Sequence, residues 1–393
     1  MTGRVRVVWA PELLGYDFGH GHPMTSERLD LTMRLAESLA VLAGDDVERV
    51  GAEPAADELL HTVHDPLYVA AVHAAAEHGR LDLERGLGTD DDPVFPHMHA
   101  AAARVVQGSV DAALAVWSGQ VEHAVNVAGG LHHAKPGAAS GFCVYNDAAV
   151  AIRALQAAGA RRVAYVDVDA HHGDGVQDVF WSDPNVLTVS LHETGHALFP
   201  GTGHPREVGG PGAEGTAVNI ALPSGTGDAG WLRAFDAVVP AVVRAFEPDV
   251  LVTQHGCDSH LLDPLTHLRV SVDAQRLVAQ RLHDLAHEVA GGRWLALGGG
   301  GYAVIDVVPR AWTHLLGIVV HRPVDPATPV PATWSDLVRD RYGRSGPPTM
   351  SDGATATFRP WSAGYDPSDD LDRVVRATRA AVFPLLGLDT DYD

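Results

Sequence analysis

Residues 162–175 read RVAYVDVDAHHGDG. The first part, Arg162–Asp169, is a short apolar run rich in β-branched residues, which is typical of a strand buried on both faces. The run passes directly into a series of aspartates, histidines and glycines. Ligand sites of open parallel sheets lie just outside the carboxyl ends of the strands. The segment therefore predicts a buried strand with a polar functional site at its end.

Further runs of the same kind alternate with helical patterns along the chain. The expected strands are Arg4–Trp9, His123–Val127, Arg162–Asp169, Val186–His192, Thr216–Leu222, Val250–His255 and Trp294–Leu297. The expected helices are Ser26–Leu42, Pro66–His78, His97–Trp117, Asp147–Ala158, Ala229–Phe246, Asp273–Val289 and Val304–Val319. This alternation predicts an α/β fold of three layers, with a mainly parallel central sheet flanked by helices on both faces.

The composition is that of a globular protein with a large core, because 46% of the 393 residues are apolar and 20% are charged. We expect one catalytic domain over residues 1–321. From Arg322 the chain becomes proline-rich (RPVDPATPVPATW) and loses its periodicity until a short helical pattern at Asp370–Leu386. We expect residues 322–393 to form an extension packed on the same domain, with a mobile tail as the alternative.

The charges and cysteines exclude several classes of protein. With 28 basic and 50 acidic residues the net charge is −22, which disfavours nucleic-acid binding and would attract basic peptides or small cations. Cys143 and Cys257 are too few for a disulfide scaffold or a Cys₄ zinc site, and they suit a reducing compartment. Neither a signal peptide nor an apolar run of ~18–20 residues is visible, so we expect a cytoplasmic protein without a membrane partner. No sequence feature sets the oligomeric state.

Imidazoles, carboxylates and one phenol follow four of the expected strands. In chain order the groups are His132 and His133; Asp167, Asp169, His171, His172 and Asp174; His255, Asp258 and His260; and Tyr302. Because the carboxyl ends of parallel strands share one edge of the sheet, we expect these side chains to converge.

The DVDAH segment has the donors of a metal site. In an extended chain Asp167, Asp169 and His171 point to the same side. Two carboxylates and an imidazole so close together are costly unless a cation neutralises them. Oxygen and nitrogen donors without thiolate suit Zn²⁺ or Fe²⁺ in an open catalytic site, and Asp258 is the best candidate for a third ligand. A hydrogen-bonded polar turn is the alternative, which the density of such groups at several strand ends disfavours.

Two other elements suit acid–base chemistry and charge stabilisation. His132 and His133 are adjacent in a predicted loop, and paired imidazoles backed by carboxylates are good general acids and bases. Tyr302 follows the glycines of Gly298–Gly301, and its phenol could donate to a developing oxyanion. A phosphate-binding loop is the rival interpretation, but neither G-x-G-x-x-G nor G-x-x-x-x-G-K-[ST] occurs there. A serine nucleophile lacks the G-x-S-x-G motif.

Five ordered motifs carry a resemblance to a known family. They are GGLHHAKPGAASGFCVYND (129–147), VDVDAHHGDGVQ (166–177), VLTVSLHETGHALFPGTG (186–203), QHGCDSHLLDPLTHL (254–268) and GGGGY (298–302). Over about residues 4–320 the chain resembles the histone deacetylase family of the arginase–deacetylase superfamily. It is most similar to the bacterial acetoin-utilisation deacetylase branch.

The resemblance implies two cations. Asp169, His171 and Asp258 would bind a catalytic Zn²⁺. A structural K⁺ would lie nearby, on oxygens contributed by Asp167, Asp169, His171, Ser190 and Leu191.

The resemblance also implies catalytic roles. His132 and His133 would activate the attacking water and protonate the leaving amine. Asp167 and Asp174 would support these imidazoles, and Tyr302 would polarise the acetyl carbonyl and stabilise the tetrahedral intermediate.

A narrow tunnel and its rim are further implications of the resemblance. Gly141, Phe142 and Phe199 would line the tunnel that holds the acyl-lysine stem, since an aliphatic stem packs well between two aromatic rings. Plain core packing is the alternative for both phenylalanines.

A rim aspartate that orients the peptide backbone is expected within GLGTDDDPVF (86–95). Asp90, Asp91 and Asp92 compete for this role, and we favour Asp90, with an exposed acidic turn as the alternative. His20 and His22 would lie near the mouth, or else stabilise a turn.

Two departures from related enzymes narrow the expected reaction. The Asp258-Ser259-His260 segment lacks the second carboxylate with which arginases bind a second metal, so we expect one catalytic metal. Leu265 stands where polyamine deacetylases have an acidic residue, which favours acyl-lysine in proteins.

The expected function is therefore hydrolysis of Nε-acetyl-lysine amides in proteins, with an acetyl-coenzyme A synthetase as a possible partner. Deacetylation of acetylpolyamines or another small acylated amine is the first alternative. A protein that binds acyl-lysine without cleaving it is the second, and the presence of every expected ligand and of the phenol disfavours it.

Overall fold

The computed structural model describes residues 3–391. Residues 1–2 of the expected domain and residues 392–393 of the expected extension lie outside the described residues. The centre of the structure is an eight-stranded sheet in the order β2-β1-β3-β8-β7-β4-β5-β6. Every pairing in this sheet is parallel, which confirms the α/β prediction and makes the sheet entirely rather than mainly parallel. The strands are β1 (Val5–Val8), β2 (Val47–Val50), β3 (His123–Asn126), β4 (Val163–Asp167), β5 (Val186–Glu193), β6 (Ala217–Leu222), β7 (Val250–Gln254) and β8 (Trp294–Leu297).

Strand β4 shows why the sheet is covered on both faces. All of its side chains are buried, and they alternate between two hydrophobic cores. Ala164 and Val166 belong to one core, whereas Val163 and Tyr165 belong to the other. A strand whose two faces are both apolar is stable only between two layers of helices.

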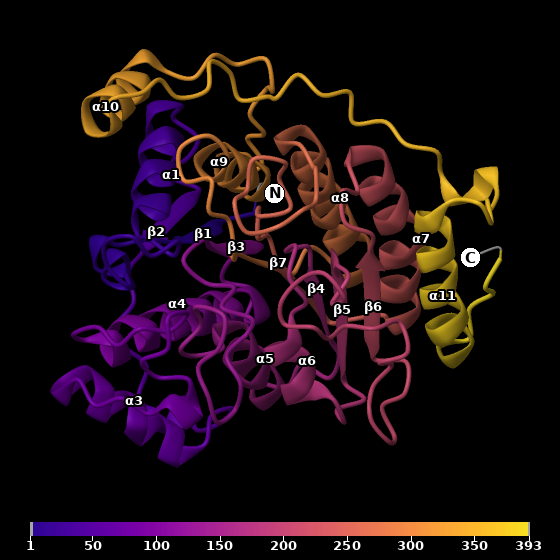
Figure 1. Ribbon diagram of the computed structural model, residues 1–393, viewed down its shortest axis with the longest axis horizontal. Helices are drawn as coiled ribbons and strands as arrows, with labels where there is room; N and C mark the ends of the chain where they lie inside the picture. The colour runs from indigo at the N-terminus through magenta and orange to yellow at the C-terminus, as the bar shows by residue number, and fades with distance from the viewer. Residues whose placement is uncertain (1–2, 392–393) are drawn as a thin grey trace.

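Helices form those two layers (Figure 1). The first core is closed by α1 (Glu27–Ser38), α7 (Asp228–Phe246), α8 (Val272–Ala290) and α9 (Val308–Val319). The second core is closed by α3 (Pro66–His78), α4 (Met98–Trp117), α5 (Asp147–Ala157) and α6 (Asp174–Phe180). A four-residue helix, α2 (Asp57–Leu60), precedes α3.

The residues after position 321 cross the outside of the first helical layer (Figure 1). They contain α10 (Ala332–Tyr342) and α11 (Asp370–Val382). Trp334 of α10 donates its indole N–H to the Leu31 carbonyl of α1 at 2.9 Å. Val375 and Val382 of α11 are buried in the first core. Both helices therefore contact the α/β core, while the division into a domain of residues 1–321 and an extension of residues 322–393 stays a prediction.

Within residues 3–391, no helix combines the length and the apolar character needed to cross a membrane.

Candidate active site

The strands that end in polar side chains are neighbours in the sheet. β3, β8, β7 and β4 lie side by side in that order, so the loops that leave their carboxyl ends meet at one edge. The expected convergence of imidazoles, carboxylates and a phenol therefore follows from the strand order.

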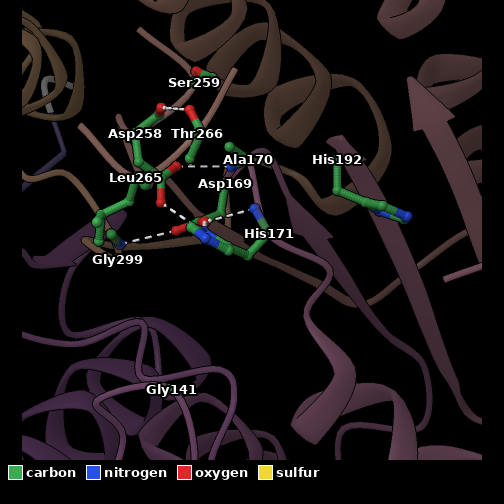
Figure 2. A network of polar contacts seen from close by, with 12 residues as sticks. Gly141, Asp169, Ala170, His171, His192, Asp258, Ser259, Leu265, Thr266 and Gly299 are labelled. Carbon is green, nitrogen blue, oxygen red and sulfur yellow. Dashed lines mark hydrogen bonds and ion pairs between the residues drawn. The ribbon is translucent and has the colours of Figure 1, made fainter. Parts of the chain in front are cut away.

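Asp169, His171 and Asp258 form a compact buried cluster at this edge. The His171 Nδ1 atom lies 3.1 Å from Asp169 Oδ1 and 2.9 Å from Asp258 Oδ2. One ligand atom from each residue lies within 4.8 Å of the others. Figure 2 shows the three side chains pointing toward one another from two separate loops.

Backbone amides hold both carboxylates of this cluster in place. Asp169 Oδ2 accepts from the Gly300 amide at 2.8 Å, and Asp258 Oδ1 accepts from the Ala170 amide at 2.8 Å. A Cβ atom at Gly300 would collide with the Asp258 carboxylate. Glycine at this position therefore lets the loop after β8 approach the cluster closely.

The donor set of the cluster fits a divalent cation. Burial and the neighbouring Asp169 carboxylate raise the pKa of Asp258 to about 8. Burial alone would raise the pKa of Asp169 too, but the imidazoles of His132 and His171 hold it well below its ordinary value. Two buried carboxylates that share one imidazole are under-neutralised, and a cation with oxygen and nitrogen ligands would relieve this.

His132 and His133 each rest on a carboxylate. His132 Nδ1 donates to Asp167 Oδ2 at 2.7 Å, and His133 Nδ1 donates to Asp174 Oδ1 at 2.7 Å. The two Nε2 atoms lie 3.1 Å apart. Because the carboxylates fix the protonated Nδ1 atoms, the Nε2 atoms are the ones that can exchange protons.

The paired imidazoles have opposite proton affinities. Burial lowers the proton affinity of His132, but Asp167 and Asp169 outweigh it and raise its pKa to about 9. Burial and the neighbouring His132 lower the pKa of His133 to about 4. Groups whose environments push their pKa values apart are typical of acid–base pairs.

A cavity of about 200 Å³ leads from the surface to the cluster. His133 and His171 lie in its walls. Five further residues that the sequence analysis named as substrate-binding or catalytic also line it: Gly141, Phe142, Phe199, Leu265 and Tyr302. Leu198 also lines it, although the sequence did not single this residue out. The ring of Phe142 packs edge-on against Tyr302 at 5.7 Å, and that of Phe199 against His133 at 5.0 Å.

Of the three candidate rim aspartates, Asp91 lines the cavity, whereas Asp90, which the sequence analysis favours, is not among its lining residues. Which aspartate has the rim role stays a prediction. Asp92 is buried beneath the turn, where burial and Asp91 raise its pKa to about 8. The His22 imidazole donates to the Asp91 carbonyl at 3.2 Å and thereby fixes the turn, while His20 is exposed.

Tyr302 faces the cavity from the loop after β8. Burial, reinforced by Asp258 and Asp169, raises the pKa of its phenol well above the ordinary value, so the hydroxyl keeps its proton. Its backbone amide donates to Asp263 Oδ2 at 2.8 Å. A protonated phenol held this way is suited to donate a hydrogen bond to an oxyanion.

Three supporting residues escaped the sequence interpretation. Gln254 donates to Asp169 Oδ2 at 2.9 Å, and Arg28 donates to the carbonyls of Gly299 and Gly301 at 3.0 and 3.2 Å. Gln254 and the third residue, Asp263, lie inside the QHGCDSHLLDPLTHL motif and could have been noticed there. No local signal marks Arg28, because its partners are distant in sequence.

Three histidines at the predicted strand ends do not join the cluster. The His255 imidazole bonds to Thr253 at 2.7 Å, and that of His172 bonds to Thr202 at 2.8 Å. His260 donates to Asp352 of the extension at 2.8 Å.

The residues expected to hold K⁺ lie on adjacent strands. Asp167 of β4 and Ser190 of β5 are register partners. Asp167 Oδ1 accepts from the Asp169 amide at 3.1 Å, and Ser190 Oγ accepts from the Gly173 amide at 3.4 Å. The potassium site stays a prediction.

Comparison with known proteins gives one consistent result. The model of the histone deacetylase domain matches residues 22–319. The acetoin utilization protein AcuC of Bacillus subtilis (strain 168) is 44% identical over 331 residues, which are 83% of this chain and 84% of that protein. AcuC of Staphylococcus xylosus is 38% identical over 332 residues, 83% of this chain and 85% of the relative.

Solved structures show the same similarity. An HDAC homolog in complex with SAHA superimposes with a TM-score of 0.82 at 26% identity, covering 95% of this chain and 100% of that one. An HDAC homolog from Aquifex aeolicus gives a TM-score of 0.80 at 26% identity with the same coverage.

Proposed function

Because the chain belongs to the histone deacetylase family, we propose that it hydrolyses the amide of Nε-acetyl-lysine in proteins, releasing acetate and the free lysine. The observation that carries this proposal is the arrangement at the base of the 200 Å³ cavity, where the Asp169–His171–Asp258 cluster lies beside two carboxylate-backed histidines and a phenol.

Asp169, His171 and Asp258 would hold the catalytic metal, Zn²⁺ or alternatively Fe²⁺. In that position it would polarise the acyl carbonyl and lower the pKa of the attacking water. The three protein ligands leave coordination positions open, as catalytic zinc sites require.

The histidine pair would move the protons. An Nε2 atom of the pair accepts the proton of the attacking water, and the protonated imidazole returns a proton to the leaving amine. Asp167 and Asp174 keep the Nδ1 atoms protonated throughout, so that the Nε2 atoms remain the reactive ones. Tyr302 donates its phenolic hydrogen to the oxyanion as it forms.

The cavity walls favour an unbranched aliphatic stem. Phe142 and Phe199 contribute aromatic walls, and Leu265 adds an apolar one. A neutral methylene chain gains from such walls, whereas the Leu265 side chain offers no charge that could pair with a second ammonium group.

An acetylated protein is therefore the proposed substrate. An acetyl-coenzyme A synthetase is the proposed partner, in keeping with the acetoin utilization named for the relatives.

Acetylpolyamine hydrolysis is the second candidate, and Asp91 is the observation that favours it. This carboxylate lines the same cavity and could pair with a distal ammonium group. On a peptide substrate Asp91 would accept hydrogen bonds from backbone amides instead.

The test is a metal analysis combined with paired assays. We expect purified protein to lose activity on chelation and to regain it with Zn²⁺ or Fe²⁺. Acetyl-lysine peptides and N-acetylpolyamines would be compared by kcat/KM, and the peptides should be preferred by at least about tenfold, or ~1.4 kcal/mol. A preference for acetylpolyamines would select the second candidate.

The Asp258→Ala variant tests the ligand assignment. It should lose the catalytic metal and its activity, because a three-ligand site loses one of its two carboxylates. If this variant keeps full activity and remains sensitive to chelators, the metal lies elsewhere.

The metal-loaded wild type tests the remaining alternative. If it binds acetylated peptide without hydrolysing it, the protein is a non-catalytic acyl-lysine binding protein.

A further inference from the structure

Four histidines lie close together at the amino ends of the strands, on the side of the sheet opposite the active site. His123 opens β3, His283 and His287 lie on α8, and His321 follows α9. One ring nitrogen from each lies within 4.8 Å of the other three. The His132–His133 loop leaves the carboxyl end of β3, whereas His123 is at its amino end, so the two sites lie at opposite ends of the same strand.

The His123 ring presents an unused nitrogen to this cluster. Its Nδ1–H donates to the Gly292 carbonyl at 2.8 Å, so Nε2 carries the lone pair. The His123 side chain is buried, and its Nε2 has no hydrogen-bond partner among residues 3–391. The ring centroids of His283, His287 and His321 lie 5.1, 5.0 and 4.8 Å from that of His123.

His283 also has a buried ring nitrogen without a hydrogen-bond partner. Its Nδ1 lies 3.0 Å from Asp284 Oδ1 and 3.3 Å from the Gln280 amide nitrogen, while its Nε2 has no partner in the described part of the chain. A buried ring nitrogen without a hydrogen-bond partner costs free energy, so two of them in one cluster favour a shared ligand.

The Glu122 carboxylate lies near the remaining two rings. Its carboxylate lies 3.8 Å from His287 Nδ1 and 3.6 Å from His321 Nε2. Each of the four imidazoles therefore has a carbonyl or carboxylate near one nitrogen, which leaves the other nitrogen for a ligand. Histidines that bind metals characteristically have this outer partner, because it fixes the tautomer and the ring orientation.

The backbone also suits a chelating site. His283 and His287 are one turn apart on α8, so their rings lie on the same helix face. His321 has a φ of 57°, in the left-handed region that favours glycine. The His321 ring contacts the rings of His123, His283 and His287.

We propose that His123, His283, His287 and His321 bind a second divalent transition metal of the Zn²⁺ type. Four neutral nitrogen donors suit Zn²⁺, Ni²⁺ or Cu²⁺ and are poor ligands for Mg²⁺ or Ca²⁺. Tetrahedral coordination at a Zn–N distance of about 2.1 Å needs ring nitrogens about 3.4 Å apart, so modest side-chain rotations would close the site.

The site is structural. All four positions are taken by protein ligands, and no open position remains for a substrate, as in closed zinc sites. The ion links β3, α8 and the segment after α9, which are distant in sequence. Its binding free energy therefore adds to the stability of the fold.

The cluster of Asp57, His73 and His99 provides a matched control. Its imidazoles already have partners, because His73 Nε2 donates to Asp57 Oδ1 at 3.0 Å and His99 Nδ1 bonds to the Tyr145 hydroxyl at 2.9 Å. No nitrogen of this second cluster is among the unpartnered buried atoms of residues 3–391.

The test uses the full chain without any polyhistidine tag. Protein stripped by a chelator is titrated with Zn²⁺ alone, and stoichiometry is read by calorimetry and elemental analysis. We expect two equivalents for the wild type and one for the His287→Gln/His321→Asn double variant. The His73→Gln control should retain two.

The Asp258→Ala variant separates the two sites. It should retain one equivalent, and this ion should raise the melting temperature. Adding His287→Gln and His321→Asn to Asp258→Ala should abolish both the binding and the thermal shift. The rings of His287 and His321 are exposed, so without metal the double variant should have the same melting temperature as the wild type. If the double variant does not fold, the His283→Gln variant replaces it in the test.

Three outcomes would overturn the proposal. They are a single equivalent in the wild type, two equivalents retained in the double variant, or loss of the second equivalent in His73→Gln. None of these outcomes depends on whether the enzyme acts on acetyl-lysine.

Discussion

Single residues at the active site differ in how far the sequence could predict them. Asp169 and His171 follow directly from the alternation at the end of β4, and Asp258 follows once β7 is placed beside β4. The rim aspartate does not follow, because three consecutive aspartates occupy a turn whose backbone conformation decides which of them faces the cavity. In the structure Thr89 Oγ1 accepts from the Asp92 amide at 3.0 Å, which fixes the turn so that Asp91 lines the cavity.

Supporting residues are harder still to find at this scale. Arg28 acts on the glycine loop from a helix almost three hundred positions earlier in the chain, since its bond to Gly301 spans 273 residues. Such a role depends on tertiary packing of α1 against α9, which no local pattern encodes.

Replacement of the phenol is the sharpest test of the proposed chemistry. Tyr302→Phe should lower kcat by about 10²-fold or more, because it removes one donor to the oxyanion. The fold and the metal content should be unchanged, since the phenolic oxygen is not part of the Asp169–His171–Asp258 cluster. Turnover close to that of the wild type, in protein with bound metal, would remove Tyr302 from the mechanism.

The two neighbouring aspartates of the rim can be compared directly. Asp91→Ala should raise KM for an acetyl-lysine peptide by about tenfold, equivalent to ~1.4 kcal/mol, because a hydrogen-bonding carboxylate of the cavity rim is lost. Asp90→Ala should leave KM within about twofold, since Asp90 is exposed outside the cavity. Steady-state kinetics of both variants on one peptide would measure these KM values. A larger rise in KM for Asp90→Ala than for Asp91→Ala would assign the rim role to Asp90.

At the scale of elements, strong apolar periodicity made prediction reliable and weak periodicity did not. The strand expected at Arg162–Asp169 contains β4 (Val163–Asp167) with one or two extra residues at each end, and each residue of β4 is buried. The edge strand β2 was missed because its sequence, VERV, has two exposed charged residues. Helix α10 was missed because Trp334 and Val338 are its only buried residues among those described.

A buried ion pair connects helix α11 to helix α7. Arg233 donates to both oxygens of Asp372, at 2.6 and 2.8 Å, and the two side chains are 4% and 0% exposed. Asp372 also accepts from Arg359 and from the Asp366 amide, each at 2.8 Å. Removal of one partner would leave a buried charge without compensation.

Asp372→Asn should therefore lower the free energy of unfolding by about 3 kcal/mol. The matched control is Arg244→Gln, which breaks a bidentate pair with Glu288 whose partners are about half exposed and should cost at most ~1 kcal/mol. Urea unfolding of both variants would decide. Equal losses would mean that the Asp372 pair contributes no more than a surface contact.

For the whole molecule, Asp352 couples the extension to the core and makes its attachment sensitive to acid. Its carboxylate accepts from His260 and from the Val272 amide, each at 2.8 Å, and from Arg310 at 2.7 Å. Burial alone would raise the pKa of Asp352, but these partners hold it well below the ordinary value.

The lowered pKa of Asp352 determines how the stability of the protein changes with pH. A carboxyl whose pKa is depressed on folding contributes stability above its unfolded pKa of about 3.9, and loses it as the pH falls toward the folded value. Asp352→Asn should therefore destabilise the protein between pH 7 and pH 5 by a constant amount. Below about pH 4 the difference from wild type should shrink, which urea unfolding across this range would measure. A difference that stays constant down to pH 3 would exclude the linkage.

The position of α11 has a consequence for synthesis of the chain. The Thr378 hydroxyl donates to the Asn219 carbonyl of β6, and Asp372 neutralises Arg233 in α7, so α11 completes a core whose partner residues lie 159 and 139 positions earlier in the chain. Until α11 has packed against the core, the β6 edge is uncovered and Arg233 lacks its counter-ion. A product truncated just before residue 370 should therefore be prone to aggregation rather than a shorter enzyme.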